Sequence, residues 1–373
     1  MRIGIDIRAL GGASGRRGVG TYIRGLLGGL AREIEGADHQ IILFTSGPLE
    51  QPAGNGFTQV PLRRPARGIT LWDQVAWPPL ISRRKLAIFH SPFYAIPRIR
   101  SRRCRVVQTI HDLTPLKFPG AVSRHNARIF RVNFSLARSA DRIIVPSRAT
   151  RDDVESLLEI PRERITVIEE ATDVTAGEVE AAGARLPELL GRLRISGSYL
   201  LHTGGHDIVK NLPGTLEAFA EIAARRDIRL VIVGEHGTGT ASAIQRAAMR
   251  GLLDRVILPG YVPRPDLIAL YRGAAALVYP SFAEGFGLPV LEAMACGTPV
   301  VTARAGALPE VGGDACLYAD PSRPETIAAA IESILDDPAR AADLSRQGRE
   351  RAARFTWREA ARRTLSVYED VAA

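Results

Sequence analysis

The chain has 373 residues, of which 46% are hydrophobic; this fraction excludes a disordered chain, and the length allows two domains, each with its own core. The three cysteines are scattered and lack metal-ligand spacing, which fits a reducing compartment. The sequence shows neither the layout of a signal peptide nor an apolar run long enough to span a membrane. We therefore expect a cytoplasmic protein. The net charge is +9, but residues 81–150 alone carry thirteen arginines and two lysines against two aspartates, a net +13. Such a bias attracts polyanions or anionic lipid headgroups, unless the charges merely solvate the domain surface.

The chain begins with a predicted strand at residues 1–8, a glycine-rich loop at 11–20 and a helix at 21–34. Strand, glycine loop and helix in this order are typical of folds that cradle a phosphate. The G-x-G-x-x-G fingerprint is incomplete, so an ordinary surface loop is the alternative interpretation.

His111 directly follows a predicted strand at 105–110. In parallel α/β sheets, functional groups gather just beyond the carboxyl ends of the strands. From its position alone, His111 is either such a group or a structural histidine. The other strands that we expect in this half lie at 39–45, 57–62, 86–90, 142–147 and 165–171, and Ser147 should cap a helix at 148–158.

A basic helix is predicted at residues 123–140, where arginines alternate with apolar residues. The pattern is amphipathic, although not cleanly so, and suits a helix that lies on a membrane surface.

Residues 172–197 are interpreted as a linker with a helical stretch near 184–193, after which strands and helices alternate again. Lys210 lies in the turn between a strand at 199–203 and a helix at 212–224, where it is well placed to pair with phosphate oxygens. Further strands are expected at 230–234, 256–262, 274–279, 299–302 and 316–319, and a final helix at 357–371.

The most informative stretch is 279–301, which predicts strand, glycine turn, helix and strand. Free N–H groups and the helix dipole at such a helix start favour an anion, for example a diphosphate. Glu284 in the turn and Glu292 one turn into the helix would repel phosphate, so we expect them to accept hydrogen bonds from ribose or sugar hydroxyls. The alternative is that Glu284 caps the turn and Glu292 is a solvated helix residue.

The run Glu284-Gly-Phe-Gly-Leu-Pro-Val-Leu-Glu292 resembles the E-x7-E motif of retaining glycosyltransferases of family 4, and the match extends from Val231 to Glu310. The resemblance implies an α/β, GT-B fold, with two doubly wound, Rossmann-like domains facing across a cleft. Residues 1–175 would form the acceptor-binding domain, and 198–354 the domain that binds the nucleotide sugar. The last helix, 357–373, would pack back on the first domain.

The resemblance also implies roles for individual residues. His111 and Glu284 would be catalytic and face the transferred sugar, while Lys210 and the N–H groups near Gly287 and Leu288 would hold the diphosphate. Glu292 would bind the ribose. The remaining donor-binding residues would be Gly18, Gly20, Tyr261, Val262 and Phe286, with Tyr261 and Val262 against the nucleobase. Where many family members have an arginine just before the lysine, this chain has Ile208-Val209.

The implied reaction moves a hexose from a nucleoside diphosphate sugar to a saccharide or lipid-linked acceptor, with retention of configuration. No cofactor is expected beyond this co-substrate, and no metal, because no Asp-x-Asp has a suitable setting. Gly4–Arg8 with Gly18–Tyr22 resembles polysaccharide mannosyltransferases, which favours GDP-mannose. The nucleobase, sugar and acceptor stay open.

The alternative functions are a nucleotide-sugar epimerase or phosphorylase on the same fold, a sugar-binding regulator, and a basic nucleic-acid-binding protein. Few aromatic residues lie on the basic stretch, so nucleic acid is not expected as a partner. We expect a cytoplasmic protein that is peripheral at the inner face of the plasma membrane.

Overall fold

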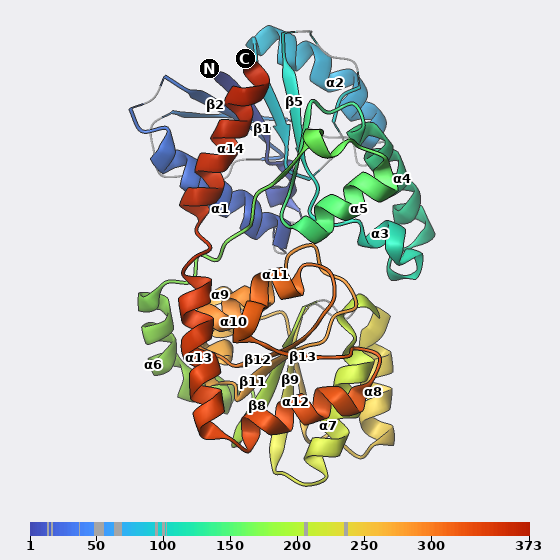
Figure 1. Ribbon diagram of the computed structural model, residues 1–373, viewed down its shortest axis with the longest axis vertical. Helices are drawn as coiled ribbons and strands as arrows, with labels where there is room; N and C mark the ends of the chain where they lie inside the picture. Colours follow the sequence, from blue (N-terminus) through green and yellow to red (C-terminus); the bar gives the residue numbers. More distant parts are fainter. Residues whose placement is uncertain are drawn as a thin grey trace. The chain divides into compact units, whose positions relative to one another are not determined.

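The computed structural model divides into two compact units: unit 1 comprises residues 1–171 and 356–373, and unit 2 comprises 172–355 (Figure 1). In each unit, helices cover both faces of a parallel sheet. The described residues are 1–12, 15, 18–36, 38–47, 56–62, 69–93, 96–98, 101, 103–204, 208–234 and 238–373.

The sheet of unit 1 has the strand order β3-β2-β1-β4-β5-β6-β7, with all neighbours parallel. The order reverses direction between β1 and β4, which is the topological switch point of a doubly wound sheet. The strands are β1 (Arg2–Asp6), β2 (Gln40–Thr45), β3 (Phe57–Pro61), β4 (Ile88–Ser91), β5 (Arg105–Thr109), β6 (Arg142–Val145) and β7 (Ile165–Val167).

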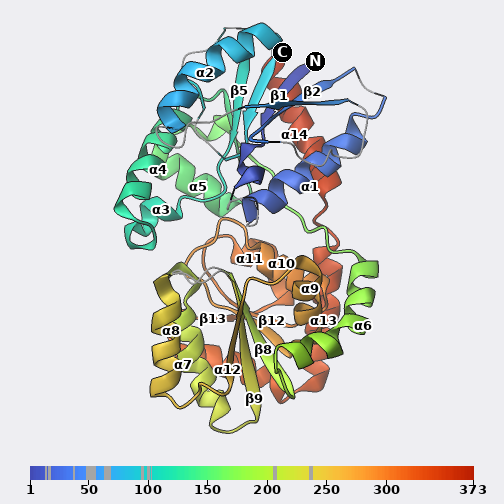
Figure 2. The same cartoon turned by 180° about the vertical axis from the view of Figure 1, so that it is seen from behind.

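The helices of unit 1 are α1 (Gly18–Glu33), α2 (Ile69–Arg84), α3 (Thr114–Lys117), α4 (Arg124–Ala137), α5 (Arg148–Leu158) and α14 (Trp357–Ala372). The predicted cap is confirmed, because the Ser147 side chain accepts from the Thr150 N–H at the start of α5. Helix α14 lies along α1 in both views (Figures 1 and 2). The close packing of α14 on α1 requires glycine at position 25, because a Cβ there would lie 2.1 Å from the Trp357 ring.

Unit 2 repeats this topology, since its strand order β10-β9-β8-β11-β12-β13 reverses between β8 and β11. The strands are β8 (Ser198–Thr203), β9 (Ile228–Val233), β10 (Val256–Gly260), β11 (Ala276–Tyr279), β12 (Val300–Ala303) and β13 (Leu317–Ala319). The helices are α6 (Ala176–Arg192), α7 (Leu212–Ala223), α8 (Thr238–Met249), α9 (Arg264–Gly273), α10 (Leu288–Ala295), α11 (Leu308–Gly312), α12 (Pro324–Leu335) and α13 (Pro338–Ala352).

The stretch that was interpreted as a linker is mostly helix α6, which packs on α9 within unit 2 (Figure 2). Its start is a capping box, in which Thr175 and Glu178 satisfy each other's backbone N–H groups. Arg185 and Arg192 on α6 both contact the carboxylate of Asp266 on α9, at 3.3 and 2.5 Å. The segment is therefore part of unit 2 and not a spacer beside it.

Candidate active site

Lys210 and Glu284 meet at the switch point of unit 2. Lys210 follows β8 and Glu284 follows β11, and the two loops are joined where the Phe282 N–H donates to the Val209 carbonyl at 2.9 Å. The Lys210 ammonium donates to Glu284 Oε1 at 2.7 Å and to the Tyr279 hydroxyl at 2.6 Å. Ligands of doubly wound sheets bind at this kind of position.

The Lys210 side chain stays charged in this setting. Burial lowers the pKa of Lys210, but the charge of Glu284 and the contact with Tyr279 raise it by more than burial lowers it, so the net shift of the pKa is upward. The lysine is also reachable, because 20% of its side chain and 12% of that of Glu284 are exposed. A diphosphate entering here would compete with Glu284 for the ammonium.

The loop after β12 supports the backbone at Glu284. The Ala307 N–H donates to the Glu284 carbonyl at 3.0 Å. A Cβ at Gly306, whose φ is +53°, would lie 2.4 Å from that same oxygen, so only glycine fits. The backbone around Glu284 is thus joined to the loop after β8 through Phe282 and to the loop after β12 through Ala307.

Helix α10 begins next to this pair, as predicted. Gly287 is its N-cap with a φ of +112°, and a Cβ there would lie 2.9 Å from Leu308 Cδ2. Leu288 is the first helical residue and Pro289 the second. Phe286 is buried and packs edge-to-face on Phe355 at 5.8 Å, which leaves its backbone as the part able to face a ligand.

Glu292 lies one turn into α10, where Tyr271 of α9 donates to its Oε2 at 3.2 Å. Tyr271 also hydrogen-bonds to Thr203 at the end of β8, at 3.2 Å. Burial raises the pKa of Glu292 to about 7, while the positive charge of Arg264 opposes the shift. Glu292 is therefore not an ordinary solvated helix residue. No sequence motif marks Tyr271, because it lies 21 residues from its partner.

Tyr261 and Val262 follow β10, which β9 separates from the strand that precedes Lys210. Tyr261 is 54% exposed, whereas Val262 is buried. The exposed ring is available for stacking, but no described contact links it to Lys210 or Glu284. The turn residues 205–207 between β8 and Lys210 lie outside the described residues.

In unit 1, His111 lies just beyond β5, as predicted, and both of its ring nitrogens have partners. Nδ1 is 2.8 Å from Glu170 Oε1 and Nε2 is 2.9 Å from the Pro92 carbonyl. The Pro92 carbonyl can only accept, so Nε2 donates to it, and Nδ1 faces the carboxyl group of Glu170. Burial lowers the pKa of His111, but the hydrogen bond and charge of Glu170 raise it overall. Glu170 was not identified from the sequence.

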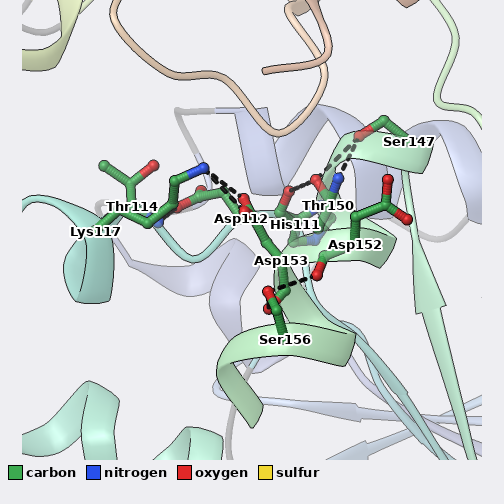
Figure 3. Close-up of polar contacts among 9 residues, drawn as sticks. All are labelled: His111, Asp112, Thr114, Lys117, Ser147, Thr150, Asp152, Asp153 and Ser156. Carbon is green, nitrogen blue, oxygen red and sulfur yellow. Dashed lines mark hydrogen bonds and ion pairs between the residues drawn. The ribbon is translucent and has the colours of Figure 1, made fainter. Parts of the chain in front are cut away.

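The backbone around His111 is also fixed (Figure 3). The Thr150 hydroxyl, from the start of α5, reaches the His111 carbonyl at 3.5 Å. The next residue, Asp112, accepts from the Thr114 N–H at 2.8 Å, and Lys117 holds both oxygens of Asp153 at 2.9 Å. These contacts attach α3 and α5 to the strand end that carries His111.

Gly18 is the first residue of α1, and Gly20 is buried in its first turn. A Cβ at Gly20 would lie 2.0 Å from the Gly15 carbonyl oxygen, so the turn requires glycine. Most of the phosphate-cradle prediction falls on the loop before α1, whose residues 13, 14, 16 and 17 lie outside the described residues.

Among the residues that the structure describes, no cluster of three or more His, Cys, Asp or Glu side chains is placed to hold a metal ion. Likewise, no helix in the described ranges is both long and apolar enough to cross a membrane.

Comparison with known proteins agrees with this geometry. The family described as "Glycosyltransferase Family 4" matches residues 16–176, and "Glycosyl transferases group 1" matches 197–351. The O-antigen chain mannosyltransferase B of Escherichia coli is 31% identical over 289 residues, which cover 76% of this chain and 74% of that protein. A glycogen synthase of Mycobacterium tuberculosis (strain ATCC 25618 / H37Rv) is 30% identical over 76% of this chain and 65% of its own length.

Solved structures share the fold over the full length. A sucrose-phosphate synthase from Thermosynechococcus elongatus superposes with a TM-score of 0.75 at 21% identity, covering 100% of this chain and 99% of that one. Anabaena HepE, solved in complex with UDP and glucose, gives 0.72 at 18% identity, with 99% and 100% coverage. The chain belongs to glycosyltransferase family 4 and has the GT-B fold. It is a glycosyltransferase.

Proposed function

We propose that the protein transfers a hexose from a nucleoside diphosphate sugar to an acceptor hydroxyl, with retention of anomeric configuration. The observation that carries the proposal is the Lys210–Glu284 pair at the switch point of unit 2, directly before the start of α10. A charged lysine and the backbone N–H groups near Gly287 and Leu288 suit a diphosphate, and a carboxylate beside them suits sugar hydroxyls.

In the proposed reaction, the bond between the anomeric carbon and the diphosphate oxygen breaks while the acceptor oxygen bonds to the same face of that carbon. The acceptor proton passes to the departing phosphate oxygen. Lys210 and the N–H groups near Gly287 and Leu288 stabilise the charge that develops on the leaving diphosphate. Glu284 orients the sugar, Glu292 orients the ribose, and His111 faces the transferred sugar.

For the substrates, we propose GDP-mannose as donor and a saccharide or lipid-linked saccharide as acceptor. The similarity to an O-antigen mannosyltransferase and the Gly4–Arg8 and Gly18–Tyr22 runs support mannose. We further propose metal-independent turnover, no nucleic-acid partner, and peripheral attachment to an anionic membrane surface, which the +13 charge of residues 81–150 supports.

The donor is tested by thermal stabilisation with GDP, UDP and ADP, since a ligand that binds the folded state raises the melting temperature. GDP should give the largest shift; a larger shift with UDP or ADP contradicts the nucleobase. Incubation of the preferred sugar nucleotide with and without acceptor, followed by NMR of the product anomer, then tests transfer. Sugar conversion without acceptor would indicate an epimerase, and inversion would contradict retention.

Metal independence is tested in the same assay after EDTA treatment. Turnover should persist. Loss of turnover that manganese or magnesium restores would contradict this part of the proposal.

A further inference from the structure

Helix α4 presents two adjacent columns of side chains to solvent. Arg124, Arg128 and Arg131 form one column, because residues spaced by four and three positions share a helix face. The neighbouring column, one position further along, is His125, Ile129 and Val132. Ile129 and Val132 are 38% and 49% exposed, which places two aliphatic side chains beside three arginines.

The opposite side of α4 attaches the helix to unit 1. Phe134 and Ala137 are buried in the core of that unit, and Phe130 stacks on Phe134 at 5.9 Å. The Ser123 side chain caps the helix by accepting from the Asn126 N–H. The outer face is therefore a fixed part of the fold.

The charge on the outer face is not balanced locally. The sequence has no acidic residue between Asp112 and Asp141, although it has five Lys or Arg there. Among the described residues, no ion pair involves the three arginines of the column. The contrast is the next helix, α5, whose Asp152 and Glu155 pair with Arg162, beyond the end of that helix, at 2.9 and 3.0 Å.

We propose that the outer face of α4 is a docking surface for an anionic phospholipid bilayer. The arginine column contacts the phosphate-bearing headgroups, and Ile129 and Val132 enter the boundary between headgroups and acyl chains. A surface helix with aliphatic and basic columns side by side has the layout of a helix that lies in this interface. A soluble polyanion would satisfy the arginines but would leave the aliphatic column in water. The proposal rests on the lipid-linked acceptor of the proposed function, because docking would hold the enzyme where that acceptor lies.

The test is flotation of the full chain, without substrates, on vesicles of phosphatidylcholine alone or mixed with phosphatidylglycerol. The wild type should float with the mixed vesicles only and be released by about 0.5 M salt, because salt shortens the range of the attraction. Changing Arg124, Arg128 and Arg131 to Glu together should lower partitioning roughly tenfold or more, since each basic residue at an anionic surface contributes to binding. A matched control changes Arg162, Arg323 and Arg358 to Glu, which alters the net charge equally and should leave partitioning within about twofold.

A second variant, Ile129→Ser with Val132→Ser, separates a bilayer from a soluble polyanion. It should lower vesicle partitioning roughly tenfold while leaving heparin binding unchanged, because only the bilayer takes up the aliphatic column. The matched control is Leu157→Ser on α5, which is 45% exposed and should have no effect. Unchanged melting temperatures would show that the variants fold.

Several outcomes would overturn the proposal. They are equal flotation of the triple Glu variant and wild type, equal binding to neutral vesicles, and insensitivity of vesicle binding to the two Ser substitutions. Transfer to a soluble saccharide acceptor should be the same in all these variants. Loss of flotation with full transfer therefore separates this surface from the active site, whereas absence of transfer in every variant contradicts the proposed function and not the docking.

Discussion

The two units share one sheet topology, and each places a cation against at least one carboxylate just after the strand that comes first in its chain order, β1 in unit 1 and β8 in unit 2. In unit 1, Arg8 after β1 contacts Asp6 at 2.6 Å and Asp73 at 2.8 Å, and these side chains are at most 1% exposed. The guanidinium also lies 4.7 Å from the centroid of the Trp77 ring. In unit 2, the Lys210–Glu284 pair at 2.7 Å keeps 20% and 12% exposure.

This comparison shows that topology alone does not make a ligand site. A buried arginine that is enclosed by two aspartates and an indole has no free approach for a ligand. The Lys210 ammonium has three rotatable donors, contacts a carboxylate and a phenol, and is partly open to solvent, so it can exchange partners. We therefore interpret the Arg8 cluster as an ion-pair cluster that stabilises the fold, and the Lys210–Glu284 pair as a candidate binding site for a ligand.

The largest expected effect is on folding. Arg8→Met should lower the free energy of unfolding by about 3–5 kcal/mol, because it leaves two buried carboxylates without their counter-charge. Lys210→Met is the matched control, and it should cost clearly less because its partner is partly solvated. Denaturant titration measures both. Equal losses would remove the distinction between the two clusters.

The next effect is on transfer. Glu284→Gln should lower the transfer rate about 100-fold or more, as is typical when a positioned polar group in an active site is lost. Nucleoside diphosphate affinity should be retained or rise, because Lys210 is released from its carboxylate. Calorimetric titration with GDP and a radiolabelled-sugar assay measure the two. Wild-type turnover would contradict the role of Glu284.

Lys210→Ala should weaken diphosphate binding by about 1.5–3 kcal/mol, the cost of losing a charged hydrogen bond. Affinity for the nucleoside without phosphates should not change, because the lysine addresses phosphate charge. Titration with GDP and guanosine gives the comparison. The same loss for both ligands would indicate damage to the fold.

The smallest effect concerns the ribose contact. Because the pKa of Glu292 is about 7, its carboxylate accepts ribose hydroxyls fully only above that pH, so nucleotide affinity should rise between pH 6 and 8. Tyr271→Phe removes a donor that favours the charged form, which should move the midpoint to higher pH and weaken binding at pH 7 a few-fold. Titration across this range is the measurement. A pH-independent affinity would mean that Glu292 does not bind the ribose.

Much of the chain was predictable from short-range patterns. Strand, glycine turn and helix around Glu284, the Ser147 cap and the position of His111 beyond β5 each depend on residues a few positions apart. Such signals act through backbone conformation and local hydrogen bonds, so they can be predicted from the sequence without knowledge of the fold. Of helix α6, only the second half was predicted, as a helical stretch near 184–193; its start was missed, although Thr175 and Glu178 give a capping signal.

The tertiary structure decided which charges are paired and which are open. Glu170 lies 59 residues from its partner His111 in the sequence, and Glu284 lies 74 residues from Lys210. Asp73, which pairs with Arg8, comes from helix α2. Whether a cation becomes a structural support or a binding group depends on burial and on partners that come from distant strands and helices. Those quantities arise only when the sheet order is formed, because desolvation and Coulomb energy depend on distance in space and not along the chain.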